Sequence, residues 1–333
     1  MARNSTDFKA VILAGGSGER FWPLSTPERP KQFLNVFGGE SLIRQSVARL
    51  RGLVEPEDVF VVTSRDLVRT TRRELPELPA ENVVGEPMRR DTGAAVALAA
   101  GLCAGGVMGV FPSDQLVGDA RGFRRAVSRA VALARRRRAV VTLGIRPAGP
   151  STAFGYVDPA EGRFVEKPDL PTAKKYLKAG YLWNAGMFIG RVEVFRDAFA
   201  RHAPALLPLC DGRRFSAARL RAVYEPLPRL SFDYAVMEAL SREGGVAVLP
   251  GDFGWDDVGG YGAFDRYYPH DADGNVSDGD CTIVESGGNV CVAKGAKVAL
   301  LGVKGLVVVT TPDAVLVADK SRVGELKKLF RKG

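Results

Sequence analysis

The chain has 333 residues, which is enough for two unequal domains. Hydrophobic residues make up 46% of it and charged residues 26%, which supplies a sizeable core and excludes wholesale disorder. The net charge is +9, from 47 Lys and Arg against 38 Asp and Glu, and it predicts anionic partners. Net charge alone does not distinguish nucleic acids, lipids and small phosphates.

The first two thirds of the chain alternate short β-rich runs with helical patterns. Strand, helix, strand at this spacing requires parallel pairing, because parallel neighbours need a long crossover. We therefore expect an open, mostly parallel α/β sheet of Rossmann-like type. The predicted strands are 8–13, 58–63, 82–86, 107–111 and 139–145, and the predicted helices are 41–50, 65–74, 92–103 and 122–136.

Residues 93–112 carry no charge, a length that would span a bilayer. The stretch holds five glycines and ends in Pro112, so we interpret it as a buried helix, a turn and a buried strand. The N-terminus lacks a secretory pattern, because its apolar run is short and continues into a glycine loop. Four widely spaced cysteines and only two histidines predict reduced thiols and no structural zinc. We expect a cytoplasmic protein with no membrane partner.

The C-terminal part has a different pattern. Apolar triplets recur every eight residues, at 282–284, 290–292, 298–300, 306–308 and 314–316. Short strands at such regular spacing predict a small β-roll or a short β-helix, and residues 322–331 predict a basic closing helix. The polar segment 270–280 is a candidate linker. We expect an α/β domain over 1–270 and a small β-helix-like domain with a terminal helix over 275–333.

A glycine-rich segment, Gly15-Gly16-Ser17-Gly18, directly follows the first predicted strand. Such glycines permit a tight turn and bring amide N–H groups close to an anion. Neither the dinucleotide fingerprint nor the Walker pattern fits, so a plain turn is an equal alternative on the glycines alone. Arg20, Arg29 and Lys31 follow in a stretch stiffened by prolines, which favours a triphosphate site.

Asp114 stands just past the predicted strand 107–111, at the edge where open α/β sheets bind ligands. A carboxylate beside phosphates is repelled unless a divalent cation bridges them, so Asp114 is a candidate Mg²⁺ ligand. Capping of the next helix is the alternative. Asp256 and Asp257 supply a remote second acidic group, since Mg²⁺ takes one or two carboxylates plus substrate phosphates.

Two further motifs suit a sugar phosphate. Lys167 offers a point charge for a monophosphate and Glu166 an acceptor for hydroxyl groups, with an exposed ion pair at a turn as the alternative. Asn184 offers both donor and acceptor to sugar hydroxyls, but it also suits a turn. The arginine run 135–138 ends a predicted helix and has no interleaved aromatic residues, so we interpret it as a solvated helix terminus rather than a nucleic-acid groove.

Together these motifs resemble the sugar-1-phosphate nucleotidylyltransferases, and within them the bacterial mannose-1-phosphate guanylyltransferases, also called GDP-mannose pyrophosphorylases. The matching stretches occur in family order from about residue 8 to 264: LAGGSGERFWPLSTPERPKQF, VVGEPMRRDT, FPSD, FVEKPD, YLWNAGMF, SFDYAVMEAL and FGWDDVGGYGAF. The resemblance implies a nucleotide-diphospho-sugar transferase fold with a C-terminal β-helix, and a homodimer. As a departure from the longer, bifunctional relatives, we expect no phosphomannose isomerase extension.

The resemblance also implies residue roles. Arg20 and Lys31 would bind the triphosphate, and Asp114 and Asp257 would share Mg²⁺. Glu86 would accept hydrogen bonds from guanine N1 and N2, which adenine cannot supply. The other implied contacts are to the nucleotide, from Leu13, Ala14, Gly15, Gly16, Ser17, Gly18 and Thr92, and to the sugar phosphate, from Gly155, Glu166, Lys167 and Asn184.

The implied reaction joins GTP and α-D-mannose 1-phosphate to give GDP-mannose and pyrophosphate. The sugar phosphate oxygen attacks the α-phosphorus in line, so positioning and charge neutralisation suffice without a protein nucleophile. Another hexose or heptose 1-phosphate, or another nucleotide, is the nearest alternative. A non-catalytic nucleotide- or sugar-phosphate-binding protein is the alternative from another class, and nucleic-acid binding ranks last.

Three positions depart from the family pattern. Arg90-Asp91-Thr92-Gly93 replaces the common Asn-Thr-Ala-Pro, and Ala153-Phe154 lies within a segment that is usually Thr-Gly-Tyr-Gly-Tyr. Gln115 replaces a frequent His after the metal-binding Asp.

Overall fold

The structure, a computed structural model, describes residues 7–16, 18–211 and 215–330. The chain forms two compact units. The first unit comprises Met1–Gly15 and Ile43–Asp256, and the second comprises Gly16–Leu42 and Asp257–Gly333. The glycine-rich segment beyond the first strand thus groups with the C-terminal part of the chain. The expected division at residues 270–275 stays a prediction.

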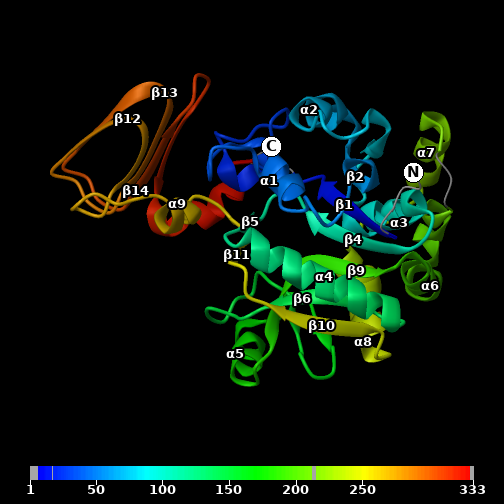
Figure 1. Cartoon of the computed structure of the whole chain (residues 1–333). Helices are drawn as coiled ribbons and strands as arrows, with labels where there is room; N and C mark the ends of the chain where they lie inside the picture. The colour runs from blue at the N-terminus through cyan, green and yellow to red at the C-terminus, as the bar shows by residue number, and fades with distance from the viewer. Residues whose placement is uncertain (1–6, 17, 212–214, 331–333) are drawn as a thin grey trace. The chain divides into compact units, whose positions relative to one another are not determined.

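A nine-stranded sheet within the described residues forms the centre of the first unit (Figure 1). Its main path runs β10–β6–β9–β4–β1–β2–β3, and the short strands β7 and β8 are attached beside β9. The pairs β1–β2, β1–β4, β2–β3 and β6–β10 are parallel, whereas β9 is antiparallel to its neighbours. The expected mostly parallel open sheet is confirmed. Its strands are β1 (Phe8–Ala14), β2 (Val59–Ser64), β3 (Val83–Glu86), β4 (Val107–Pro112), β6 (Val140–Ile145), β7 (Tyr156–Val157), β8 (Phe164–Val165), β9 (Leu182–Arg191) and β10 (Val246–Gly251).

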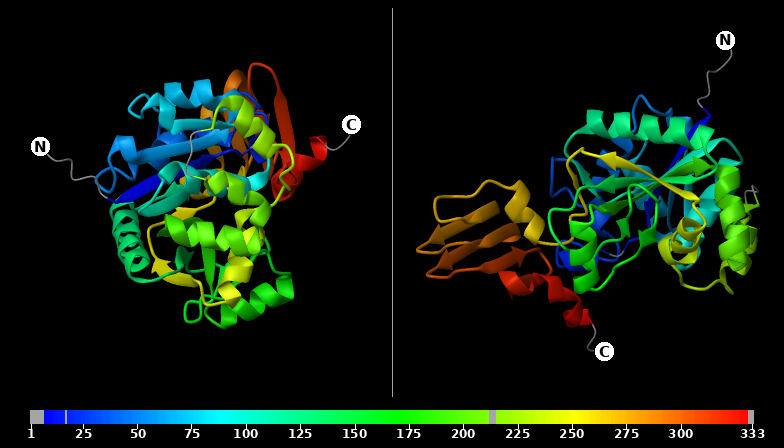
Figure 2. Two further views of the ribbon diagram at one scale, coloured as in Figure 1. Left: turned by 90° about the vertical axis from the view of Figure 1, so that its right-hand side faces the viewer. Right: turned by 90° about the horizontal axis from the view of Figure 1, so that it is seen from below.

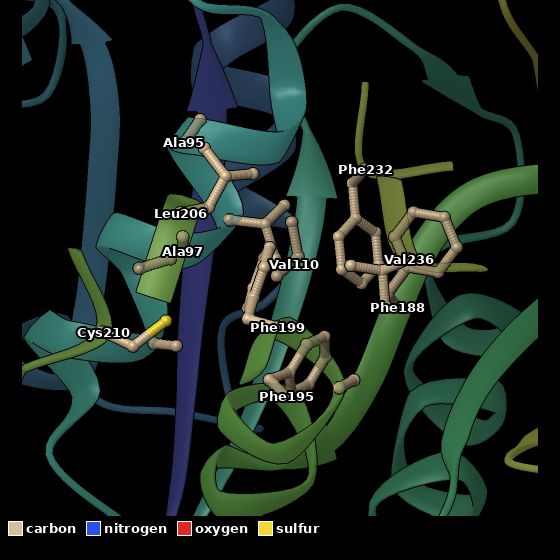
Figure 3. Packing of buried hydrophobic residues seen from close by; sticks show 14 of the residues in the cluster. Ala95, Ala97, Val110, Phe188, Phe195, Phe199, Leu206, Cys210, Phe232 and Val236 are labelled. Atoms are coloured by element: carbon tan, nitrogen blue, oxygen red, sulfur yellow. The ribbon is translucent and has the colours of Figure 1, made fainter. Parts of the chain in front are cut away.

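Helices cover both faces of this sheet. Adjacent residues of a strand point to opposite faces, and in β4 the ring of Phe111 packs against Phe123 of α4 while Val110 joins the core beneath α3 and α6. Figure 3 shows the second of these faces, where Phe199 of α6 and Phe232 lie near Val110. The helices are α1 (Leu42–Ala48), α2 (Val68–Glu74), α3 (Asp91–Cys103), α4 (Ala120–Arg136), α5 (Leu170–Lys178), α6 (Val192–His202), α7 (Ala217–Tyr224) and α8 (Glu238–Arg242).

The uncharged stretch 93–112 forms most of α3, a turn and β4, as expected. Nearly every side chain of α3 is buried, because its alanines and glycines let neighbouring segments approach closely. No helix among the described residues is both long enough and apolar enough to cross a membrane. The arginine run ends α4, and the guanidinium of Arg138 forms an ion pair with Asp197.

The second unit contains a separate four-stranded sheet (Figure 2). Its strands lie in chain order, β12 to β13 to β14 in parallel and β15 antiparallel to β14. Their inward side chains pack together around Cys291, Leu300 and Val308. This arrangement confirms the expected β-helix-like fold. The strands are β12 (Val276–Val284), β13 (Val290–Leu301), β14 (Leu306–Thr310) and β15 (Val315–Asp319).

Three details of the expected C-terminal pattern were wrong. The triplets 290–292 and 298–300 belong to one strand, β13, because a register shift between Gly279 and Cys281 of β12 absorbs the residues between them. The closing helix is of the 3-10 type and begins at Lys320 (η8, Lys320–Phe330), while residue 331 lies outside the described part of the chain. The expected linker 270–280 overlaps β12, which already begins at Val276.

Candidate active site

The carboxyl end of β1 carries Leu13, Ala14 and Gly15 to the edge of the sheet. The carbonyl oxygen of Ala14 accepts a hydrogen bond from Thr63 Oγ1 of β2 (2.9 Å), and that of Leu13 accepts one from the amide of Ser113 (3.1 Å). These bonds fix the end of β1 to both neighbouring chain segments. The glycine turn therefore starts from a rigid point of the sheet.

Glu86, the last residue of β3, has its carboxylate beside this point. A Cβ atom built on Gly15 would lie 3.7 Å from Glu86 Oε2, and the hydroxyl of Tyr224 donates a hydrogen bond to Glu86 Oε1 (3.1 Å). Burial raises the pKa of Glu86 to about 7, the bond from Tyr224 acts in the opposite direction, and the charge of Asp91 adds to the rise. The predicted base-reading carboxylate thus lies beside the predicted nucleotide turn. Thr92 is the second residue of α3, and its hydroxyl oxygen accepts a hydrogen bond from the backbone amide of Phe232 (2.9 Å).

In the second unit the glycine-rich segment folds back on Lys31. Gly18 has a left-handed φ of 66°, and a Cβ atom there would lie 2.5 Å from the Lys31 amide nitrogen. Only glycine fits this close approach. Ser25 Oγ donates to the Gly18 carbonyl (2.6 Å) and closes the turn. The candidate residue Ser17 lies outside the described residues.

The same unit brings Arg20, Lys31 and Asp257 together, although Lys31 and Asp257 are 226 positions apart. Lys31 is only 6% exposed, and its Nζ donates to the Asp257 carbonyl (2.6 Å). Arg20 Nη1 and Asp257 Oδ2 lie 3.2 and 3.8 Å from a Cβ built on Gly259, so both side chains flank that glycine. Two cations, Arg20 and Lys31, suit a ligand that carries several negative charges. The Asp257 carboxylate beside them suits a divalent ion bound to that ligand.

Two side chains anchor this segment from the C-terminal part of the second unit. Tyr261, just before α9 (Gly262–Tyr267), donates from its hydroxyl to the carbonyls of Phe21 (2.9 Å) and Trp22 (3.1 Å). The ring of Phe330 in η8 lies edge-on to Trp22, with centroids 5.9 Å apart. Residues beside Arg20 are therefore held by the end of the chain.

Asp114 lies two residues beyond the end of β4 and belongs to the first unit, with the buried Arg49 guanidinium close to it. Arg49 Nη1 donates to the carbonyl of Gln115 (3.0 Å), and Nη2 donates to that of Pro112 (3.1 Å). Burial lowers the pKa of Arg49 to about 10, and the charge of Asp114 opposes this change, so the cation persists at neutral pH. The alternative role of Asp114 as a helix cap is wrong, because Asp119 caps α4.

The donor chemistry of Asp114 and Asp257 fits Mg²⁺, which takes hard carboxylate oxygens and completes its shell with phosphates and water. Over residues 7–16, 18–211 and 215–330 there is no group of three or more His, Cys, Asp or Glu side chains that would enclose a metal. Two carboxylates with substrate oxygens would suffice. Asp114 belongs to the first unit and Asp257 to the second, so their pairing stays a prediction.

The predicted sugar-phosphate residues converge within the first unit. Lys167 Nζ lies 2.8 Å from Glu166 Oε1. The backbone N–H of Asn184 donates a hydrogen bond to the Gly155 carbonyl (2.8 Å). A Cβ on Gly155 would lie only 2.5 Å from Glu166 Oε2. The two partners of this ion pair differ in exposure, since the Lys167 side chain is 53% exposed and that of Glu166 only 9%. Asn184 is buried within β9 rather than placed in a turn.

Asp233 completes this group. It accepts a hydrogen bond from Asn184 Nδ2 (3.2 Å), while Thr142 Oγ1 donates to Asn184 Oδ1 (2.8 Å). Burial, and then the charge of Glu166, raises the pKa of Asp233. Burial lowers the pKa of Lys167, but its contacts with Glu166 outweigh this and raise it overall. The site thus combines an ammonium group with acceptors for hydroxyl groups.

Three aromatic rings pack together around Phe154, the residue before Gly155. The Phe154 ring is 4.8 Å from that of Trp183 and 5.5 Å from that of Trp255, measured between centroids. The Trp255 indole donates to Gln115 Oε1 (2.9 Å), and Gln115 Nε2 donates to the Ala185 carbonyl (2.9 Å). Phe154 and Gln115, which both depart from the family pattern, therefore both contact the side chain of Trp255.

Sequence reasoning missed Arg49, Tyr224 and Asp233. Arg49 and Tyr224 lie in ordinary helical surroundings, and no local pattern distinguishes them. Asp233 lies inside the motif SFDYAVMEAL and begins a π-helix (η7, Asp233–Met237). Single π-turns are frequent at functional sites, so the motif itself was the available signal.

The fold and these residues define a class of enzyme. The family model described as Nucleotidyl transferase matches residues 9–273, and the model described as MannoseP isomerase/GMP-like beta-helix domain matches residues 279–332. The chain belongs to the nucleotidyl transferase family. The matches also agree with the α/β sheet and the separate C-terminal sheet described above.

Named relatives narrow the class further. Mannose-1-phosphate guanylyltransferase of Escherichia coli (strain K12) is 37% identical over 96% of this chain and 72% of its own length. The mannose-1-phosphate guanylyltransferase named ManC of Salmonella typhimurium is 36% identical over 100% of this chain and 74% of its own length. The crystal structure named mannose-1-phosphate geranyltransferase from Thermus thermophilus has a TM-score of 0.87 at 36% identity, covering 98% of this chain and 99% of that one. The resemblance to mannose-1-phosphate guanylyltransferases is confirmed.

Proposed function

We propose that this protein transfers GMP from GTP to α-D-mannose 1-phosphate, giving GDP-mannose and pyrophosphate. The observation that carries the proposal is the match to mannose-1-phosphate guanylyltransferases along nearly the whole chain. The half-buried Glu86 carboxylate beside Gly15 supports guanine as the base, because a carboxylate accepts the N1 and N2 hydrogens that adenine lacks.

In this proposal each cluster has one task. The backbone of residues 13–18 and Thr92 holds the nucleotide, and Glu86 reads the base. Arg20 and Lys31 neutralise the triphosphate charge that grows as pyrophosphate leaves. Lys167 holds the monophosphate of the sugar, and Gly155, Glu166 and Asn184 bind the hexose hydroxyls.

We propose Asp114 and Asp257 as the protein ligands of a bound Mg²⁺. The ion, when bound, would offset the repulsion between the sugar phosphate and the triphosphate and polarise the reacting phosphate. The chain's own contribution is alignment, since an oxygen of the sugar phosphate must face the α-phosphorus in line with the departing pyrophosphate. The reaction needs no nucleophile from the protein.

Product identification tests the proposal. Purified protein incubated with GTP, mannose 1-phosphate and Mg²⁺ should yield GDP-mannose and pyrophosphate in equal amounts, and chelation of the metal should stop the reaction. Parallel incubations with ATP, CTP and UTP, and with glucose 1-phosphate and a heptose 1-phosphate, separate the alternatives. Binding of the substrates without pyrophosphate release would identify a non-catalytic binding protein.

We further propose a homodimer that acts in the cytoplasm. Large apolar side chains of the C-terminal sheet are exposed, with Leu301 71%, Val315 62% and Val317 63% exposed, which supports an interface between two copies of the chain. All four cysteines are free thiols, which fits a reducing compartment. Sedimentation equilibrium should give twice the chain mass, and Val317→Lys should lower it to that of a monomer.

A further inference from the structure

The Glu86 carboxylate has two differently placed oxygens. Oε1 accepts a hydrogen bond from the Tyr224 hydroxyl (3.1 Å), whereas Oε2 is the atom that a Cβ on Gly15 would meet at 3.7 Å. Tyr224 is fully buried, so its hydroxyl has a fixed direction. Burial, and then the neighbouring carboxylate, raises the pKa of Tyr224 well above its usual range, so the phenol remains a donor at any assay pH.

The backbone of Tyr224 is fixed from a second direction. It is the last residue of α7, where helix carbonyls lack partners within the helix. Arg90 Nε donates to the Tyr224 carbonyl (3.0 Å), and Arg90 Nη2 donates to that of Glu225 (2.6 Å). Arg90 is also the first residue of the segment that departs from the family's Asn-Thr-Ala-Pro. The departure therefore supplies a cap for the helix that carries Tyr224.

We propose that Tyr224, held by Arg90, is a positioning residue that fixes one oxygen of the Glu86 carboxylate, leaves the other beside Gly15 and so sets the selectivity for guanine. This inference rests on the proposed function, because it assigns Glu86 to the base. It adds two residues, Tyr224 and Arg90, to which the resemblance assigned no role.

The physical reason is the charge of Glu86. A carboxylate accepts hydrogen bonds from both guanine groups, the N1 hydrogen and the 2-amino group. In a protonated carboxyl one oxygen is itself a donor, so it repels one of these two guanine donors. Burial raises the pKa of Glu86 to about 7, and the hydrogen bond from Tyr224 favours the charged form. Without that bond the pKa rises further, and less of the enzyme carries an acceptor at neutral pH.

The neighbouring charged groups Asp91 and Arg90 do not supply the hydrogen bond by which Tyr224 favours the charged form of Glu86. Asp91, at the start of α3, raises the pKa of Glu86 further by its negative charge. The Arg90 guanidinium is engaged by the two carbonyls at the end of α7. The Tyr224 hydroxyl is the group whose loss changes the protonation of Glu86 most directly.

The test compares GTP with inosine triphosphate, which lacks the 2-amino group, in the full-length Tyr224→Phe protein. We expect the acidic limb of the pH profile of kcat/KM for GTP to move up by about one to two pH units, the range expected for a hydrogen bond to a charged group. The loss at pH 6.5 should exceed that at pH 8.5 by about tenfold. At pH 7 the preference for GTP over inosine triphosphate should fall by about tenfold or more.

Tyr181→Phe is the matched control, because its phenol also bonds a carboxylate, that of Asp158, and it takes no part in the proposed site. Its pH profile should match that of the wild type. If Tyr224→Phe does not fold, Arg90→Gln is the second variant, because it weakens the hydrogen bonds that hold the end of α7 and so the position of Tyr224. It should move the pH profile in the same direction. An equal loss at every pH and for both nucleotides would overturn the inference. A wild-type enzyme that does not use GTP would instead overturn the proposed function.

Discussion

Asp114 and Asp119 stand close together after β4, yet their surroundings give them different roles. Asp119 accepts hydrogen bonds from the amides of Arg121 and Gly122 and caps α4, whereas Asp114 is the proposed metal ligand. Asp114→Ala should lower kcat by about a thousandfold or more and leave the fold intact. Asp119→Ala should lower the free energy of unfolding, because the amides of Arg121 and Gly122 lose their acceptor, and should preserve turnover. Pyrophosphate release and thermal unfolding measure the two effects, and a near-normal rate for Asp114→Ala would contradict the assignment.

At Gly155 the absence of a side chain is itself the feature that matters. A Cβ atom there would lie 2.5 Å from Glu166 Oε2, so Gly155→Ala must displace that carboxylate. We expect KM for the sugar phosphate to rise by about tenfold or more and KM for GTP to stay the same. Gly149→Ala is the control, since nothing lies within 4 Å of its added Cβ atom. An equal rise in both KM values would show that Gly155 does not belong to the hexose site.

At the scale of elements, the turn after β4 depends on one buried cation. Arg49 holds the carbonyls of Pro112 and Gln115 and lies over the Phe123 ring. Arg49→Met removes the donors and leaves these buried acceptors without partners, so we expect a loss of about 2–4 kcal/mol of unfolding free energy together with a lower kcat. Denaturant titration measures the first effect and initial rates the second.

Arg51→Met provides the comparison. Its side chain is 70% exposed and lies 3.8 Å from Glu77, so its removal should change stability by less than about 1 kcal/mol. Similar stability of the two variants would mean that the turn does not depend on Arg49.

The sequence predicted most parallel strands and their helices, because each is a continuous apolar run followed by a turn signal. β1, β4 and α4 agree with prediction to within two residues at either end. The antiparallel strand β9 was not placed among them, and Asn184, which lies in this strand, was also expected to suit a turn. Its place between β4 and β6 is set by tertiary pairing and not by local periodicity. In the C-terminal sheet the eight-residue spacing could not reveal that β13 spans two triplets.

At the scale of the whole molecule, the segment 16–42 depends on the end of the chain. The Phe330 ring lies against Trp22, and edge-on aromatic pairs contribute about 0.5–1.5 kcal/mol. Phe330→Ala should therefore lower kcat/KM for GTP by a few-fold to about tenfold, because Arg20 is only two residues from Trp22. Leu329→Ala, at a more exposed neighbouring position, should have no effect. Steady-state kinetics of both variants measures the difference, and equal activity would exclude a role for this contact.

The candidate site was predictable where its chemistry is local. Arg20, Lys31 and Lys167 lie in motifs whose residue types indicate phosphate binding. Tyr224 could not be found in this way, because its bond to Glu86 joins residues 138 positions apart and its own surroundings in the sequence are those of an ordinary helix. Such supporting contacts depend on packing, which no spacing rule encodes.

The interleaved second unit has a consequence for synthesis on the ribosome. Residues 16–42 emerge early, but the segment 257–333 that completes their unit is translated only after residues 43–256. At about 5–20 residues per second, the early segment waits roughly 10–40 s for its partner. A nascent chain thus lacks a completed second unit, which holds the proposed triphosphate site. We expect cleavage or stalling near the end of the chain to leave the large sheet formed but the product inactive.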